Sequence, residues 1–315
     1  MRADIPSFFL GFGWARYKEI NGWKTERFLA RRSSRIVAIT QLFVKSKFSF
    51  GLAWAPGGIA LIDAHDTSVQ MSEIFQSARE YLEKLLPNFL IRLSINQEAH
   101  HRDVLSDCFV APLVRLNSSE TLIIDCFNFA VSSCSKHARR KIKESLNLKI
   151  DWSDECTNSN LSSLSSLIRL TSRRNSTVLP FGALNELNKL ISQLDRQQYI
   201  VLVGRHGSEE VSGCLVLLCG RTAFFCAAGS SDLARGNSTN YLLIIELIRR
   251  LKIAGIDTLD FGGLSENNKL PGLDRFKIGF GGTKFRKVGE REFSRLPVIR
   301  LLFNFLILLR ASYRG

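Results

Sequence analysis

The sequence predicts an α+β fold built on mixed β-sheets, and three observations support that prediction. The chain has 315 residues, of which 45% are hydrophobic and 23% are charged, so its composition is globular and its length suits two domains. Short β-rich runs alternate with helical patterns in its first third. Its second half has the order strand, strand, strand, loop, helix, strand. The composition excludes a wholly disordered chain, while the order of elements fits more than one kind of mixed sheet.

Apolar spacing and turn residues define the elements of the first third. We expect a helix over residues 8–20, strands over 35–42, 49–54 and 59–62, a helix over 72–85, and β-rich runs over 89–93 and 121–125. The helix over 72–85 is supported by apolar residues at helical spacing and by Pro87, which ends the pattern. A turn at Pro56-Gly57-Gly58 separates two of the strands.

A basic helix is expected in the middle of the chain, over residues 135–146, where Ala138, Ile142 and Leu146 are four apart. The stretch 153–166 is rich in Ser, Asn and Thr, which suits helix caps and a connector between two halves. We therefore divide the chain into an N-terminal domain of residues 1–134 and a C-terminal domain of residues 135–315 that ends in a helical tail.

The second half has the clearest pattern. Strands are expected over residues 199–204, 211–219 and 222–228, a polar loop over 229–239, an amphipathic helix over 241–254 and a strand over 258–261. The amphipathic helix is predicted from a stripe of Tyr241, Ile244, Ile245, Ile248 and Leu251.

The net charge of +14 predicts attraction to phosphate-bearing partners. Residues 15–36, 136–149 and 285–315 together carry +15, so the rest of the chain is nearly neutral. Any one such segment also fits a solvated helix face. Three patches on a neutral body favour recognition of phosphates, and a membrane surface is a further alternative; sequence-specific DNA binding is not expected.

The cysteines and the apolar segments predict a cytoplasmic protein. The seven cysteines include no C-x-x-C pair, and Cys214, Cys219 and Cys226 lie in apolar runs, so we expect reduced and mostly buried thiols, without a zinc site. No cleaved signal peptide is expected at the N-terminus. The apolar stretch 301–309 is too short to cross a bilayer. We favour a buried closing helix for it over a helix that lies on a membrane surface.

One candidate binding motif is the loop Ala234-Arg-Gly-Asn-Ser-Thr-Asn240, which precedes the amphipathic helix. Backbone N–H groups at a helix start bind phosphate, and Arg235 offers a charged fork. The alternative is that Asn237, Ser238 or Thr239 only caps the helix.

The densest candidate for chemistry is the run Asp260-Phe-Gly-Gly263, then 267–272, then Arg275-Phe-Lys-Ile-Gly-Phe-Gly-Gly282. Glycines on both sides of a Phe-Lys pair allow the backbone to approach a ligand closely. A lysine held among aromatic residues and glycines places a positive charge near a developing oxyanion. The alternative is a glycine-rich hairpin with an exposed lysine.

These motifs resemble the closing signature of the Fem family of peptidoglycan-bridge aminoacyltransferases and its BioF2-like relatives in the acetyltransferase (GNAT) superfamily. Trp14-Ala-Arg-Tyr-Lys18 is similar to the family's opening helix, and the loop 229–235 with helix 241–254 matches its most regular part. The specific similarity covers about residues 225–285. The resemblance implies two tandem GNAT-like domains with a cleft for an acyl or aminoacyl donor and an amine acceptor.

The resemblance also implies roles for single residues. Lys277, with Phe276, corresponds to the Phe-Lys pair whose lysine is placed at the reacting ester, and Arg235 and Lys18 correspond to contacts with acceptor phosphates. We expect further substrate-binding residues among the neighbours of these motifs, namely Asp260, Asn240, Tyr241 and Arg275. Transfer in the family needs no metal, and none is expected.

The sequence departs from the family in one turn and in the loop that faces a donor. The family's Arg-Gly-Pro turn is replaced by Pro56-Gly57-Gly58, which removes a charge, and no charged coiled-coil arm is present. Coenzyme A-dependent acetyltransferases have repeated glycines in the pyrophosphate loop, whereas only Gly236 stands in this one. We therefore favour aminoacyl-tRNA as co-substrate, with acyl-CoA as the alternative, and expect no permanently bound cofactor.

Two hypotheses about function follow. The first is an N-acyl or aminoacyl transferase that acts on a phosphate-linked cell-envelope precursor of peptidoglycan or surface polysaccharide, with Lys277 stabilising the intermediate. The second is a basic peripheral membrane or nucleic-acid-binding module without catalysis. The two are compatible if the acceptor is lipid-linked and the protein lies at the inner face of the cell membrane.

Overall fold

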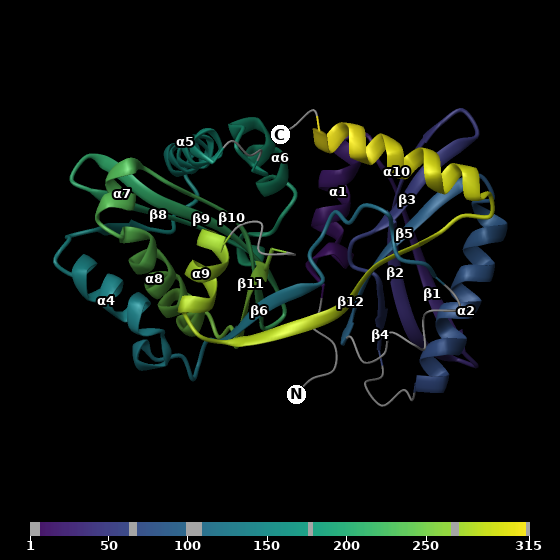
Figure 1. Cartoon of the computed structure of the whole chain (residues 1–315), viewed down its shortest axis with the longest axis horizontal. Coiled ribbons are helices and arrows are strands. Elements are labelled where there is room, and N and C mark those ends of the chain that lie inside the picture. The colour runs from purple at the N-terminus through teal and green to yellow at the C-terminus, as the bar shows by residue number, and fades with distance from the viewer. Residues whose placement is uncertain (1–6, 63–67, 99–108, 176–178, 266–270, 313–315) are drawn as a thin grey trace. The chain divides into compact units, whose positions relative to one another are not determined.

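A computed structural model describes residues 7–62, 68–98, 109–175, 179–265 and 271–312 (Figure 1). The chain forms two compact units. The described residues of the first unit lie within Met1–Glu120 and Phe285–Tyr313, and those of the second unit lie within Thr121–Lys284. The C-terminal part of the chain thus returns to the first unit. The prediction of two domains, residues 1–134 and 135–315, stays a prediction.

The first unit is built on a mixed sheet with the strand order β1-β2-β3-β5-β12. Its strands are β1 (Lys24–Arg32), β2 (Arg35–Lys47), β3 (Phe50–Ala55), β5 (Phe89–Glu98) and β12 (Thr283–Phe293), and the short β4 (Ile59–Leu61) pairs with β2. Only β3 and β5 run parallel among the neighbouring strands described, and α2 (Ser68–Leu85) connects them. The other pairs are antiparallel, so the sheet is mixed, as predicted.

Apolar side chains of α2 and of the strands form the core of the first unit. Ile74, Phe75 and Leu82 of α2 pack with strand residues such as Leu42 and Ile91. The unit also contains the one-turn 3₁₀ helix Phe8–Leu10, α1 (Phe12–Ile20) and, at its C-terminal end, α10 (Pro297–Ser312). No helix in the described part of the chain is long and apolar enough to span a membrane.

The second unit has its own mixed sheet, with the strand order β6-β11-β10-β9-β8-β7. These strands are β6 (Glu120–Asp125), β7 (Asp151–Ser153), β8 (Tyr199–His206), β9 (Glu209–Cys219), β10 (Thr222–Ser230) and β11 (Thr258–Gly263). β10 and β11 run parallel, and α8 (Thr239–Ile253) is the helix between them. The strand, strand, strand, loop, helix, strand order of the prediction is confirmed.

Helices cover both faces of this sheet (Figure 1). On one face, α4 (Lys136–Ser145) and α8 pack Ile142 and Leu247 against strand residues that include Cys214 and Val216. On the other face, α5 (Asn158–Arg174) approaches the glycines of β9 and β10, and α6 (Leu184–Ile191) follows it. A Cβ on Gly229 would lie 2.2 Å from the backbone carbon of Leu167 in α5. The backbones of α5 and β10 are therefore in direct contact at Gly229.

Several elements differ from the predictions. The stretch 153–166 is no connector, because most of it lies in α5, which buries Leu161, Leu164 and Ile168 and is capped by Thr157. The loop 229–239 contains a short helix, α7 (Asp232–Gly236). The glycine-rich run after residue 270 forms α9 (Pro271–Gly279) and not a hairpin. The motif residues 266–270 and Cys108 lie outside the described residues.

Candidate active site

The candidate site lies where two parallel strands of the second unit stop pairing. β10 and β11 form a ladder of three residue pairs, from Thr222↔Thr258 to Phe224↔Asp260. β10 continues along β9, with a bulge between Phe225 and Ala227, while β11 continues to Gly263. The rings of Phe225 and Phe261 meet edge to face, with centroids 5.0 Å apart, just beyond the ladder. The end of β11 is thereby available to present its polar groups to α9.

Lys277 is the buried cation of this site. It lies on α9 with 8% of its surface exposed, and its Nζ donates a hydrogen bond to the carbonyl oxygen of Gly263 at 2.7 Å. Gly262 has φ +84°, a backbone conformation that glycine adopts readily, and a Cβ at that position would be in ordinary contact with the Lys277 Nζ, at 3.5 Å. The alternative of an exposed lysine on a hairpin is therefore wrong.

Two buried carboxylates, of Asp274 and Asp260, favour the charged form of Lys277. Burial lowers the pKa of the Lys277 ammonium, while Asp274 and Asp260 act in the opposite direction. Asp260 accepts hydrogen bonds from the Thr121 hydroxyl and, at 2.9 Å, from the Gly262 N–H. Asp274 accepts bonds from the N–H and the hydroxyl of Ser265. The site thus holds a fixed, poorly hydrated positive charge, which is suited to stabilising an oxyanion.

Aromatic rings surround the backbone of α9 on the side of α8. The Phe276 ring lies edge to face on Tyr241 of α8 at 5.0 Å and on Phe280 at 5.1 Å, and it is 6.1 Å from Phe261. Burial raises the pKa of the Tyr241 hydroxyl. Phe276 and Tyr241 are therefore packing partners that fix the position of α9, and any direct role toward a substrate stays a prediction.

The remaining predicted residues of this unit occupy exposed or half-buried positions. Arg275 precedes Phe276 on α9 and is exposed, and Arg235 is exposed near the end of α7. Asn240 is half-buried in the first turn of α8. Ser238 occupies the cap position of α8 with φ 60° but makes no side-chain capping bond. The capping alternative for Asn237, Ser238 or Thr239 is thus not realised at the cap itself; the Thr239 hydroxyl instead donates to the Ala234 carbonyl.

Lys18 belongs to the first unit, where it lies in a group of aromatic rings. Its Nζ is 4.9 Å from the Trp54 ring centroid and 5.4 Å from those of Trp14 and Trp23. Burial, followed by the neighbouring Lys45, lowers the pKa of Lys18 to about 8. Cation–π contacts of this kind stabilise a partly desolvated ammonium. Its predicted contact with acceptor phosphate stays a prediction.

Sequence reasoning missed three groups of the site. Asp274 lies three residues before Lys277, which is the spacing of neighbours on one helix face, so a helix prediction over 271–279 would have found it. The partners Thr121, on β6, and the Gly263 carbonyl depend on strand pairing between distant segments. No local signal identifies those two.

Comparison with known proteins finds a family model that matches part of the chain. Residues 183–310 match the model of the FemAB family. This stretch includes both α8 and α9, so the predicted resemblance is confirmed for the part of the chain that carries Lys277. No curated protein matches the chain in sequence.

Solved structures agree on the fold. The chain is similar to FemX, with a TM-score of 0.76 and 16% identity over 92% of each chain. It is also similar to the C-terminal domain of a protein from Agrobacterium fabrum described as a lysylphosphatidylglycerol synthetase (TM-score 0.54, 12% identity, 90% and 89% of the two chains). A tandem GNAT protein from the clavulanic acid biosynthesis pathway matches with a TM-score of 0.54 and 8% identity over 87% and 84%. The predicted α+β, tandem GNAT-like fold class is confirmed.

Proposed function

Because residues 183–310 match the FemAB family, we propose that the protein transfers an aminoacyl or acyl group to an amine of a phosphate-linked cell-envelope precursor. The observation that carries this proposal is Lys277, a buried ammonium that Gly263 fixes between two buried carboxylates. The similarities to FemX and to a lysylphosphatidylglycerol synthetase support a cell-envelope acceptor.

The proposed step is an attack of the acceptor amine on the carbonyl carbon of a donor ester or thioester. The C–N bond forms, and the carbonyl oxygen becomes an oxyanion to which Lys277 donates a hydrogen bond. The bond to the leaving oxygen or sulfur then breaks and an amide results. The amine gives up one proton and the leaving group takes one. A lysine with a lowered pKa is also a proton donor suited to that leaving group.

Aminoacyl-tRNA is the proposed donor, with acyl-CoA as the alternative. The segment before α8 has a single glycine, Gly236, followed by Asn237 and Ser238, so side chains stand where a pyrophosphate loop has bare backbone. Arg235 is exposed and carries the charge that suits a phosphate of either substrate. The basic α4, whose Arg140 and Lys143 are exposed, adds charge for a polyanionic donor.

The test compares the full chain with Lys277→Met in transfer assays. Purified protein receives either charged tRNA or acetyl-CoA together with a peptidoglycan precursor linked to uridine diphosphate, and mass spectrometry measures the added mass. We expect Lys277→Met to lower turnover by about 10²–10³-fold, the usual loss of an oxyanion donor. Unchanged turnover in this variant contradicts the proposal.

Lys252→Met is the matched control. Lys252 also donates a hydrogen bond to a backbone carbonyl, that of Phe129 at 3.1 Å, but it lies at the C-terminal end of α8. Both variants lose a lysine and one such bond, so equal losses of activity would trace to stability and not to chemistry.

The pH dependence of the rate is a second test. As the pH rises, Lys277 should lose its proton before an ordinary lysine does, because its pKa is lowered, and the rate should fall with it. Lys277→Arg should shift that fall to higher pH.

A further inference from the structure

The C-terminal helix α10 exposes apolar side chains and buries polar ones. Over residues 297–309, where the side chains are described, the outward ones are apolar. Seven large ones are 43–67% exposed: Val298, Leu301, Leu302, Phe305, Leu306, Leu308 and Leu309. At 100° per residue these positions cover one side of the helix. A helix on the surface of a globular protein normally turns charged or polar residues to water on that side. A contiguous apolar surface of this kind indicates an interaction site.

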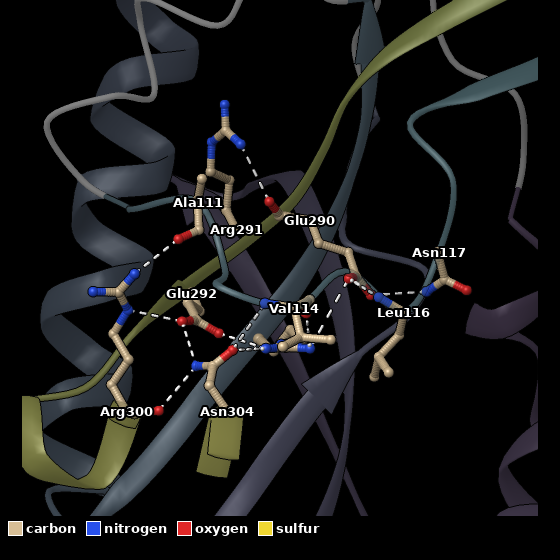
Figure 2. A network of polar contacts seen from close by, with 10 residues as sticks. Ala111, Val114, Leu116, Asn117, Glu290, Arg291, Glu292, Arg300 and Asn304 are labelled. Atoms are coloured by element: carbon tan, nitrogen blue, oxygen red, sulfur yellow. Dashed lines mark hydrogen bonds and ion pairs between the residues drawn. The ribbon is translucent and has the colours of Figure 1, made fainter. Parts of the chain in front are cut away.

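Two polar residues of α10, Asn304 and Arg300, point inward instead. Asn304 is fully buried, and its side chain contacts Glu292 of β12 at 2.8 Å and Arg92 of β5 at 3.0 Å. Arg300 donates to Glu292 at 2.7 Å and to the Ala111 carbonyl at 2.8 Å (Figure 2). These buried, charge-assisted bonds fix the rotation of the helix. The sequence favours a helix that is buried throughout, and that prediction is wrong for the outward side of α10.

The segment that is hydrogen-bonded to α10 also presents apolar side chains. Its Ala111 and Val114 contact Arg300 and Asn304. Val110, Leu113 and Leu116 in the same segment are 45%, 60% and 51% exposed. The apolar surface is thus not confined to the helix.

We propose that α10 docks this unit on an anionic lipid surface. The charges around the helix are complementary to such a surface: Arg295 precedes the helix, Arg310 follows the apolar stretch in the sequence, and the chain has no acidic residue after Glu292. The helix is 16 residues long, which suits a position in the headgroup plane and is too short for a span. A second copy would bring these same arginines face to face, so charge disfavours it as the occupant.

This docking needs no folding of the helix on the membrane. Free amphipathic segments become helical when they bind, whereas α10 is already held by Asn304 and Arg300. Binding therefore leaves the helical content unchanged. The proposal does not rest on the transfer reaction, since it concerns residues of the first unit alone.

The experiment measures binding of the full chain to vesicles of phosphatidylcholine with and without phosphatidylglycerol, by flotation at several salt concentrations. The variant is Leu302→Gln/Phe305→Gln, at side chains 53% and 56% exposed. The matched control is Leu29→Gln/Phe48→Gln, which removes the same two residue types from exposed positions of β1 and the β2–β3 turn. We expect binding to anionic vesicles and a loss of roughly tenfold or more in the α10 variant.

Three results would overturn the proposal. Wild-type protein that stays unbound at low salt excludes the lipid surface. Equal losses in the α10 variant and the Leu29/Phe48 control place the contact elsewhere. A wild-type dimer that the α10 variant converts to a monomer, measured by analytical ultracentrifugation without vesicle binding, makes a second copy the occupant. Lys277→Met serves as a further control, because it should bind vesicles as the wild type does whether or not transfer is found.

Discussion

Replacing Arg92 with methionine tests how strongly the buried polar network holds the C-terminal helix. Arg92 is fully buried, and its Nη2 is 2.7 Å from Glu292 Oε2 and 3.0 Å from the Asn304 side-chain oxygen. Its Nη1 donates to the Val114 carbonyl at 3.0 Å. Methionine keeps much of the side-chain volume but provides neither charge nor donors. The variant therefore leaves Glu292 buried with Arg300 as its only cationic partner among the described residues.

The expected loss in the free energy of unfolding is about 3–5 kcal/mol, the usual cost of removing one partner of a buried ion pair. That is a large share of the roughly 5–15 kcal/mol by which proteins are stable. The loss should depend on pH. Burial raises the pKa of Glu290, which is also buried 4.0 Å from Arg92, while the charge of Arg92 acts to lower it. Without Arg92 the protonated folded form is therefore favoured further as the pH falls. The loss should be smaller at pH 5 than at pH 8.

Urea unfolding followed by tryptophan fluorescence measures this loss. Trp14, Trp23 and Trp54 lie in the first unit and Trp152 in the second, so a Trp152→Phe background reports on the first unit alone. Arg32→Met is the control, because Arg32 and Glu73 form an exposed pair at 2.9 Å whose expected contribution is about 0–1 kcal/mol. If Arg92→Met costs no more than Arg32→Met, or if its loss grows toward acid pH, the reasoning about the network is wrong.

Two further predictions concern the contact of α5 with its sheet and the ammonium of Lys18. Gly229→Ala should destabilise the second unit by about 1–3 kcal/mol, since its Cβ would meet the backbone of Leu167 at 2.2 Å. Gly236→Ala is the control, because a Cβ there meets no atom within 4 Å. Equal melting temperatures of the two variants would contradict this prediction. Lys18 should titrate at about pH 8 in NMR spectra of the dimethylated protein, so between that pH and the ordinary lysine range its contribution to stability should rise with pH. A midpoint above 10 would contradict the burial of its ammonium.

Strongly patterned segments could be predicted from the sequence, and the reason is local. The runs that became β8, β9, β10 and α8 combine apolar periodicity with clear turn residues. Even there, the buried stripe of α8 includes Leu243 and Leu247 beside the predicted Ile244, Ile248 and Leu251. For α2, the spacing predicts that Ile74, Ala78, Tyr81 and Leu85 share the buried face. In the structure Phe75 and Leu82 are buried with Ile74, while Tyr81 and Leu85 are exposed. The existence of a helix follows from its pattern, whereas its rotation is decided by what it packs against.

Segments whose composition contradicts their structure could not be predicted. The many serines of α5 make it look like a loop in the sequence. Ser163 and Ser165 can be buried because their hydroxyls donate hydrogen bonds to the carbonyl oxygens of Ser159 and Gly182, respectively. In the candidate site, Lys277 and Asp260 stand out by their glycine neighbours, and the structure brings the two together in one unit. Helix α10 has apolar residues on every side, so its sequence pattern does not show which side is buried. The hydrogen bonds of Asn304 and Arg300 decide which side faces the protein.

The return of the chain to its first unit has a consequence for synthesis. The second unit is formed by the continuous stretch Thr121–Lys284, so all of its strands are synthesised before β12 and α10. The first unit begins earlier but is completed last. Arg92 is synthesised 200 residues before Glu292, and during that interval it has no carboxylate of β12 to pair with. The unit at the N-terminus therefore finishes folding after the unit that follows it, which reverses the usual N-to-C order of domain folding.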